Sequence, residues 1–372
     1  MVFNNQFMST FMTKPVTRRD FSKALLLATA AAPILAPTLR AAEATPTRLK
    51  LGYDNFVVRA MKWKAAALID YAAKQKVDSL FITDLDALES FETPHLTELR
   101  ARARDFGVEV QLGTWSICPT SKSFRNKWGT AEEHLGLGLK AAKDLGSPVL
   151  RVVLGSGEDR KTPGGIEARI ADTVKVCKAL RSRAVDFGVK IAVENHAGDM
   201  HSRELVALVE QAGKDYVGVN IDPGNACWTM EDPVANLENL GPYTLTSSMR
   251  DSMIWEYAEG AKVQWTAMGE GIVDWKTYFK RYRELCPTAP VHIETISGFA
   301  KDFSYLKPGF WDVWPSFRAS DFTRFVALAK RGHAIDPHRS PNDIAEQDYQ
   351  KGELERSLAH CRGELGLGVR TA

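Results

Sequence analysis

Cysteine is scarce in this chain of 372 residues, and its spacing lacks the patterns of a disulfide framework or a zinc ribbon. There are five cysteines, an odd number, widely spaced and without a C-x-x-C pair. A small disulfide scaffold and a cysteine-rich metal site are therefore excluded, although a single disulfide pair is left open. The fold must depend on a hydrophobic core, for which the 44% hydrophobic content provides ample material.

A surplus of positive charge is also missing once the first 44 residues are set apart. The whole chain has a formal charge of +2, of which +3 comes from that segment, so the rest carries about −1. Nucleic-acid binding requires a basic surface, and we expect no nucleic-acid partner. A long apolar run is absent too, because the run from Ala24 is interrupted by Pro33 and Pro37. We therefore predict no stable insertion into a membrane.

Residues 1–44 have instead the three-part pattern of an export signal. The charged segment Thr17-Arg-Arg-Asp-Phe-Ser-Lys23 precedes the apolar run, and Ala42-Glu-Ala44 is typical of a cleavage site. The paired arginines, followed by Phe and Lys, resemble a twin-arginine signal. We predict a signal peptide over residues 1–44 and a periplasmic or secreted mature protein. An ordinary secretory signal or a buried first helix is the alternative.

From residue 45 to residue 332, short apolar runs alternate with amphipathic stretches. We expect parallel strands near residues 50–55, 79–83, 108–116, 149–154, 190–194, 217–222, 243–248 and 291–294. A helix is predicted after each strand, the last of them over residues 321–330. Eight such repeats predict an α/β fold, a single (β/α)8 TIM barrel. The alternative, a doubly wound sheet, would need a glycine-rich nucleotide loop after its first strand, and none is present.

Residues 333–372 form a polar tail that contains one more predicted helix. Leu354, Leu358, Cys361 and Leu365 make a narrow apolar stripe along it. We expect this C-terminal helical extension to pack on the outside of the barrel or on a second subunit, so a homo-oligomer is one prediction. A solvated tail is the alternative.

Carboxylates stand at the ends of three predicted strands. Glu194 ends the fifth strand, Asp222 the sixth and Glu294 the eighth. The carboxyl ends of barrel strands form the catalytic face, so these three side chains are expected to converge. Converging carboxylates repel one another unless a cation neutralises them. Oxygen ligands suit Mg²⁺ or Mn²⁺, and Zn²⁺ or Co²⁺ beside a histidine. The alternative is that each carboxylate is a satisfied polar end of a core strand.

Four short motifs at the ends of the fifth to eighth strands resemble the xylose-isomerase-like barrels, a superfamily of sugar isomerases and epimerases with related dehydratases. They are Glu194-Asn-His-Ala-Gly198, Asp222-Pro-Gly-Asn225, Met249-Arg-Asp251 and Ile293-Glu294. The resemblance covers residues 48–330. It implies one divalent metal ion, held by Glu, Asp, His and Glu, that polarises a sugar carbonyl or hydroxyl while acid–base residues move a proton. Residue by residue, it makes Glu194, Asp222 and Glu294 metal ligands.

The histidine ligand of that family is missing from this chain. It normally stands two residues before the basic residue of the seventh-strand motif, where the sequence has Ser248. The metal then lacks a ligand, is bound through water on Ser248, or takes His196 or His292 instead. We name Ser248 and His292 as further candidate metal ligands. The same substitution favours the alternative of a barrel that binds a sugar without catalysis.

Other residues near the strand ends are candidates for substrate contact: His196, Asn225, Arg250, Trp115 and Trp228. An arginine can bind a substrate oxygen or carboxylate, and a tryptophan can stack on a sugar ring. Structural roles are the alternatives, namely a loop hydrogen bond for His196 and an ion pair with a neighbouring aspartate for Arg250.

The segment after the eighth strand is rich in aromatic residues. They are Phe299, Phe303, Tyr305, Phe310, Trp311, Trp314 and Phe317. Such rings form either a lid over the mouth of the barrel or a small core that packs this segment against it.

The function that follows is that of a metal-dependent sugar or polyol isomerase or epimerase with a small carbohydrate as substrate. Glu194 and Glu294 are the predicted catalytic residues, which remove and return a proton next to a carbonyl. One divalent ion, Mn²⁺, Mg²⁺, Co²⁺ or Zn²⁺, stabilises the enediolate. The alternatives are a keto-sugar or keto-glycoside lyase, which shares the first step, and a non-catalytic sugar-binding barrel.

Overall fold

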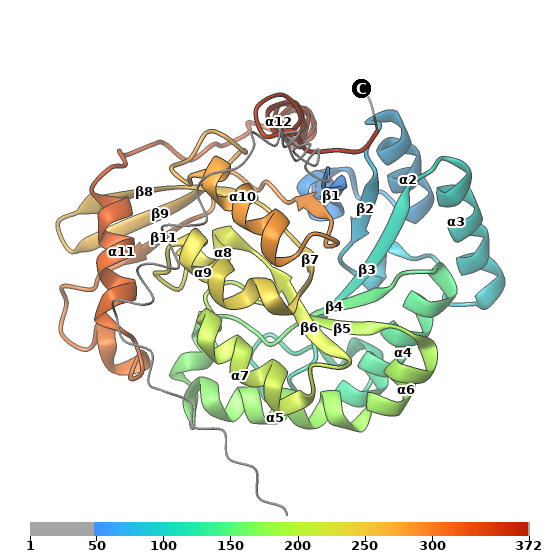
Figure 1. Cartoon of the computed structure of the whole chain (residues 1–372), viewed down its shortest axis with the longest axis horizontal. Coiled ribbons are helices and arrows are strands. Elements are labelled where there is room, and N and C mark those ends of the chain that lie inside the picture. Colours follow the sequence, from blue (N-terminus) through green and yellow to red (C-terminus); the bar gives the residue numbers. More distant parts are fainter. Residues whose placement is uncertain (1–47, 371–372) are drawn as a thin grey trace, which may run out of the picture. The chain divides into compact units, whose positions relative to one another are not determined.

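The computed structural model describes residues 48–370, and the predicted signal peptide lies outside these residues. Eight parallel strands form one sheet in the order β10-β1-β2-β3-β4-β5-β6-β7 (Figure 1). A parallel bridge from Met249, just after β7, to Ile293 in β10 joins the two outer strands. The predicted (β/α)8 barrel is thus confirmed. Its strands are β1 (Leu51–Asp54), β2 (Ser79–Ile82), β3 (Glu109–Ser116), β4 (Val149–Val153), β5 (Lys190–Glu194), β6 (Val217–Ile221), β7 (Thr244–Ser247) and β10 (Val291–Ile293).

Helices follow the strands and cover the outside of the barrel. Their apolar faces, such as Leu205, Leu208 and Val209 of α7, are buried in the same core as the strands. They are α2 (Ala65–Lys74), α3 (Thr93–Asp105), α4 (Ala131–Leu145), α5 (Gly165–Ala179), α6 (Arg181–Phe187), α7 (Ser202–Ala212), α8 (Pro223–Cys227), α9 (Pro233–Leu240) and α10 (Trp275–Leu285). Short 3₁₀ helices are η1 (Asn55–Met61), η2 (Leu85–Ala87), η3 (Asn126–Trp128), η4 (Gly157–Lys161), η5 (Gly241–Tyr243) and η6 (Phe310–Val313).

A second, antiparallel sheet, which the sequence analysis did not predict, stands beside the barrel. It has the order β11-β9-β8 and is formed by β8 (Asp251–Tyr257), β9 (Gly260–Thr266) and β11 (Ala300–Phe303). The last predicted barrel helix, α11 (Ala319–Ala329), packs on β8 and β9 of this sheet (Figure 1). The aromatic segment forms a small core here, since Phe303 and Trp314 are buried with Phe325 of α11. The small core is therefore the interpretation that the structure supports for most of that segment.

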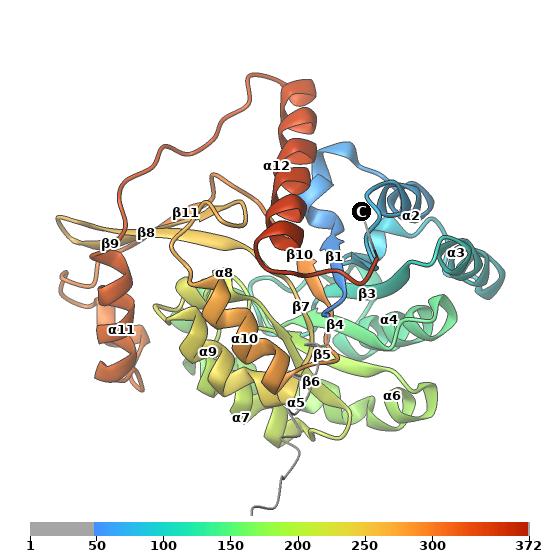
Figure 2. The same cartoon turned by 45° about the horizontal axis from the view of Figure 1, so that its top comes forward.

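The C-terminal helix α12 (Asp343–Gly363) packs on the barrel, as one of the two expectations had it. Figure 2 shows it beside β10, and it also contacts η1. Leu354, Leu358 and Cys361 of the predicted stripe are fully buried in the main core. The tail is therefore part of the folded unit rather than a solvated extension.

The predictions about cysteines and about membrane insertion can be compared with the structure of residues 48–370. All five cysteines lie in this range, where each is buried and unpaired. No helix in the same range is long and apolar enough to cross a membrane.

The packing of α12 predicts a large effect of a single truncation. Replacing Leu358, which is fully buried, with Ala should lower the free energy of unfolding by about 2–5 kcal/mol, because a cavity is left in the core. Urea denaturation of the mature protein measures this change. The control Ile344→Ala, on the same helix but 72% exposed, should change it by less than about 0.5 kcal/mol. Equal effects of the two substitutions would contradict the packing described.

Candidate active site and metal centre

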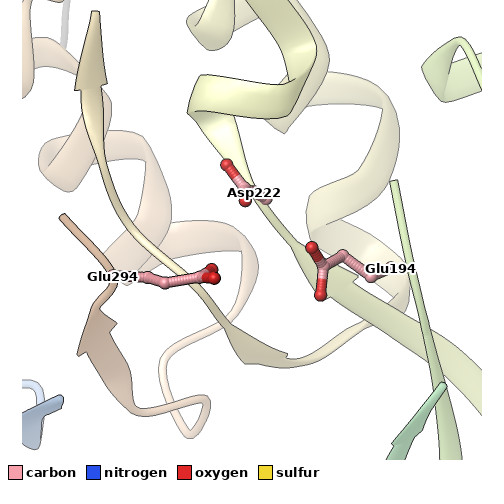
Figure 3. Close-up of side chains that lie close together, drawn as sticks. All are labelled: Glu194, Asp222 and Glu294. Carbon is pink, nitrogen blue, oxygen red and sulfur yellow. The ribbon is translucent and has the colours of Figure 1, made fainter. Parts of the chain in front are cut away.

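Three carboxylates converge at the carboxyl ends of β5, β6 and β10. The side chains of Glu194, Asp222 and Glu294 point toward one another (Figure 3), and one oxygen of each lies within 4.8 Å of the other two. Glu194 and Asp222 are fully buried and Glu294 is 5% exposed. The predicted convergence is present, whereas the catalytic and metal-binding roles of these residues stay predictions.

Two buried arginines contact these carboxylates. The Nη2 atom of Arg250 donates to Asp222 Oδ2 and to Glu294 Oε2, so the guanidinium bridges the two side chains. Arg151, inside β4, donates through Nε to Glu194 Oε2 and through Nη1 to the carbonyl of Thr114. Arg250 was predicted as a substrate contact, with an ion pair to the neighbouring Asp251 as the structural alternative. It pairs with Asp222 and Glu294 instead. Arg151 was missed.

A fourth buried carboxylate, Asp54 at the end of β1, belongs to the same cluster. Its Oδ1 accepts hydrogen bonds from the Phe56 amide at 2.8 Å and from Thr83 Oγ1 at 3.2 Å. Its Oδ2 accepts from Ser248 Oγ at 3.3 Å, and Ser248 Oγ in turn accepts from Asn220 Nδ2 at 3.2 Å. Ser248, a predicted candidate metal ligand, thus lies between a carboxylate and an amide at the edge of the site.

The cluster contains four carboxylates and only two guanidinium groups. If all six groups are ionised, their net charge is −2, and little water is present to screen it. The pKa values reflect this excess. Burial and then the charge of Glu294 raise the pKa of Asp54 well above its ordinary value. Burial also raises the pKa of Asp222, with Arg250 opposing the shift.

Glu194 and Glu294 differ in their surroundings. Burial alone would raise the pKa of Glu194, but Arg151, His196 and Arg250 together outweigh it and the pKa is lowered. Glu194 also accepts hydrogen bonds from Asn220 at 2.8 Å and Asn225 at 3.1 Å, so its charge is well compensated. The pKa of Glu294 is raised by burial, with Arg250 opposing the shift. Glu294 is therefore the carboxylate with the higher affinity for a proton.

His292 lies apart from the three carboxylates. Its Nε2 is 2.8 Å from Ser79 Oγ and its Nδ1 is 3.2 Å from the Ser247 carbonyl, so both ring nitrogens already have partners. Burial lowers the pKa of the ring to about 4, which makes it neutral. The structure brings Ser248 to the edge of the cluster but does not bring His292 to it.

A cavity of about 280 Å³ opens over the cluster, and all five predicted substrate contacts border it. Glu294 also borders it, whereas Glu194 does not. The predicted contacts that border the cavity are Trp115, His196, Asn225, Trp228 and Arg250. Their convergence on one cavity is what a binding site requires.

His196 and Asn225 also have partners inside the protein. His196 Nδ1 is 2.7 Å from the Gly155 carbonyl, which only accepts, so Nδ1 carries the proton and Nε2 is left as an acceptor. Burial lowers its pKa to about 4. Asn225 Nδ2 donates to both Glu194 and Asp222, and its Oδ1 accepts from the Ala197 amide at 3.0 Å. Asn225 thus fixes the two carboxylates relative to the loop after β5.

Aromatic residues beyond those predicted complete the cavity. Trp265 of β9 stacks on Trp228 with ring centroids 4.0 Å apart, and the Arg250 guanidinium lies 4.3 Å from the Trp265 ring. Phe56 and Phe299 are 39% and 47% exposed at the cavity's edge. Phe299 thus borders the site, unlike the other rings of its segment. Trp265 was missed because the antiparallel hairpin was missed, although the alternation of residues 251–266 is a strand signal.

The fold and this arrangement define an α/β barrel with a buried carboxylate centre at the carboxyl ends of its strands. The family described as "Xylose isomerase-like TIM barrel" matches residues 63–307, about two thirds of the chain. The protein belongs to that family.

Individual relatives are distant. A 3-oxo-isoapionate decarboxylase from Pectobacterium atrosepticum is 22% identical over 186 residues. The match covers 50% of this chain and spans only 60% of the length of that relative.

One similar solved structure is that of a D-psicose 3-epimerase crystallised in the presence of D-fructose. It has a TM-score of 0.58 and 18% identity, and the match covers 86% of this chain and 100% of the other. The IolI protein with a zinc atom is similar with a TM-score of 0.52 and 16% identity, over 77% of this chain and 100% of the other. At these identities the likeness establishes the fold.

The pairing of Arg151 with Glu194 predicts a loss of stability when the cation is removed. Arg151→Met leaves a fully buried carboxylate without its cation and should lower the free energy of unfolding by about 3–5 kcal/mol. The matched control is Arg181→Met, which breaks an exposed pair with Asp215 and should leave the unfolding midpoint almost unchanged. If both variants unfold like the parent protein, Arg151 does not compensate the charge of Glu194.

Proposed function

We propose that this protein is a divalent-metal-dependent enzyme that moves a proton next to the carbonyl of a keto-sugar, with isomerisation or epimerisation as its reaction. The observation that carries this proposal is the cluster at the barrel mouth. Its four buried carboxyl groups outnumber its two arginines by two, which is an excess of two negative charges when all are ionised, and the carboxyl group of Glu294 borders the cavity. A divalent cation supplies the two missing positive charges.

The residues present suit such an ion. Glu194, Asp222 and Glu294 offer one oxygen each within a space of 4.8 Å, and hard oxygen donors favour Mg²⁺ or Mn²⁺, with Zn²⁺ or Co²⁺ as further candidates. The guanidinium of Arg250 bridges Asp222 and Glu294, so it must release at least one of them when an ion is held there. When bound, a divalent ion polarises a carbonyl oxygen of the substrate.

Glu294 and Glu194 differ in their access to the cavity and in their proton affinity. Glu294 borders the cavity and has a raised pKa, which brings its proton affinity closer to that of an effective general base. Glu194 is held by Arg151 and two asparagines, behind the cavity wall. This asymmetry favours Glu294 as the group that removes and returns the proton, with Glu194 as the fixed ligand and second candidate. A single base suits isomerisation, since epimerisation needs proton transfer on both faces.

A lyase reaction is the second candidate, and the decarboxylase relative favours it. Decarboxylation of a 3-oxo acid and elimination from a keto-sugar both pass through an enolate, as proton abstraction does. The same electrostatic stabilisation of the enolate oxygen therefore serves all three reactions. The third candidate, a sugar-binding barrel without catalysis, is favoured by Ser248 in the place of the histidine ligand.

A periplasmic or secreted location is part of the proposal. It is supported by the twin-arginine pattern at Arg18 and Arg19 and by the apolar run and Ala42-Glu-Ala44 that follow it. Cell fractionation tests it, because replacing both arginines with Lys should retain the protein in the cytoplasm, and unchanged export would contradict a twin-arginine route.

Exchange of substrate hydrogen with D₂O tests the common first step. Mature protein supplied with Mn²⁺ should incorporate deuterium next to the carbonyl of a keto-sugar from a panel that includes D-psicose, D-fructose and 3-keto-glycosides. NMR or mass spectrometry measures the exchange rate. Glu294→Gln should lower it by about 10²–10⁴-fold, because the general base is lost.

The control for that experiment is Glu231→Gln. Glu231 is as buried as Glu294 but hydrogen-bonded to Ser202 away from the cavity, so its loss should leave the exchange rate within a few-fold of the parent protein. If no member of the panel exchanges, or if Glu294→Gln exchanges normally, the proposed chemistry is wrong. Binding of an unreacted sugar would then favour the non-catalytic alternative.

A further inference from the structure

A second cavity, of about 510 Å³, lies beside the active-site cavity and is the larger of the two. It is bordered on one side by η4 and on the other by β11 and the segment that leads through η6. Lys301 of β11 borders it, and the Nζ atom of this lysine lies 5.3 Å from the ring centroid of Trp228. Because Trp228 borders the active-site cavity, the two cavities are neighbours across this tryptophan.

Lys301 is unusual among the charged residues of this region. Its side chain is half-buried, and its ammonium group has no hydrogen-bond acceptor or ion-pair partner among residues 48–370. Two glycines make room for it. A Cβ atom at Gly198 would lie 2.7 Å from Lys301 Nζ, and one at Gly157 would lie 3.1 Å from it. The ammonium group lies 5.3 Å from the ring centroids of Trp228 and Phe303, and no carboxylate pairs with it there, so a ligand carboxylate can do so.

The acidic residues that border the second cavity do not provide that counter-ion. Glu158 pairs with Lys161 at 2.7 Å, and Asp302 pairs with Lys262 at 3.2 Å. Asp312 is exposed at the rim.

The neighbouring cations reinforce the need for an anion. Burial first, and then Lys161 and Arg160, lower the pKa of Lys301 to about 8, while the charges of Glu158 and Asp199 oppose the shift. Arg160 pairs with Glu204, but its buried Nε atom has no partner among the described residues. Lys301 and Arg160 thus bring two donors without a protein partner to the border of this cavity.

We propose that this second cavity binds the carboxylate of an acidic sugar, with Lys301 as the cation that pairs with it. One unpaired ammonium group matches the single charge of a carboxylate better than the double charge of a phosphate. The ring of Phe310, which also borders the cavity and is partly exposed, provides apolar surface of the kind on which a sugar ring packs. The inference does not depend on a metal ion, since Lys301 lies outside the carboxylate cluster.

Binding of D-glucuronate to the mature protein tests this inference, with D-glucose as the uncharged probe. Isothermal titration calorimetry should show binding of glucuronate that Lys301→Met weakens at least about tenfold, because a charge-assisted hydrogen bond is lost. Lys301→Arg should retain most of the affinity. The matched control is Lys307→Met, whose exposed lysine pairs with Glu259 and does not border this cavity, and it should bind glucuronate like the parent protein.

A measurement on the unmodified chain avoids any effect of substitution on folding. The pKa of Lys301, followed by NMR, should rise from about 8 toward the ordinary lysine value as glucuronate is added. Unchanged Lys301 titration, equal affinity of the Lys301→Met variant, or no binding of glucuronate at tens of millimolar would each overturn the inference. None of these results depends on proton exchange at Glu294, so this inference and the proposed function fail separately.

Discussion

The structure of the barrel mouth depends on the compensation of buried negative charge. Asp54, Glu194, Asp222 and Glu294 are each at most 5% exposed, and a carboxylate so placed requires a cation or a proton. Arg151 and the bridging Arg250 supply two positive charges, which leaves a deficit of two. Ser248 adds no charge to this balance, since its neutral hydroxyl donates a hydrogen bond to Asp54 at 3.3 Å. Charge compensation therefore links the arginines, the proposed metal ion and the proton affinity of Glu294.

The parts of the chain outside the eight strands complete this centre. The antiparallel sheet brings Trp265 against Arg250, so the arginine that bridges two carboxylates is held between them and an aromatic ring. On the other side, α12 fixes η1, which carries Phe56 at the cavity's edge. Gln350 accepts from the Ala60 amide at 2.9 Å, and Gln347 donates to the Ala60 carbonyl at 3.2 Å. The antiparallel sheet and α12 thus shape the cavity over the carboxylates as well as the core.

Strands and their end residues were predictable from the sequence because local pattern decides them. The run that ends in Glu194 and the run that ends in Asp222 have the same form, and both strands were predicted correctly. Asp54 ends a similar apolar run, and Arg151 interrupts another. Both positions were therefore recognisable in the sequence, although neither was predicted. The bridging of two carboxylates by Arg250 had no such signal, because it depends on β6 and β10 lying on either side of β7 in the closed barrel. The lack of an ion-pair partner for Lys301 could not be predicted either, because it depends on the packing of β11 against Gly157 and Gly198, which are distant in the sequence.

The most direct test of the charge deficit is a crystal structure of the mature protein grown with Mn²⁺ and measured for anomalous scattering. We predict one strong anomalous peak among the oxygens of Glu194, Asp222 and Glu294, with the Arg250 guanidinium moved away from at least one of its two carboxylates. An absence of any peak, with Arg250 still bridging Asp222 and Glu294 at saturating Mn²⁺, would contradict a metal-dependent centre. The four carboxylates would then be compensated by the two arginines and by protons alone.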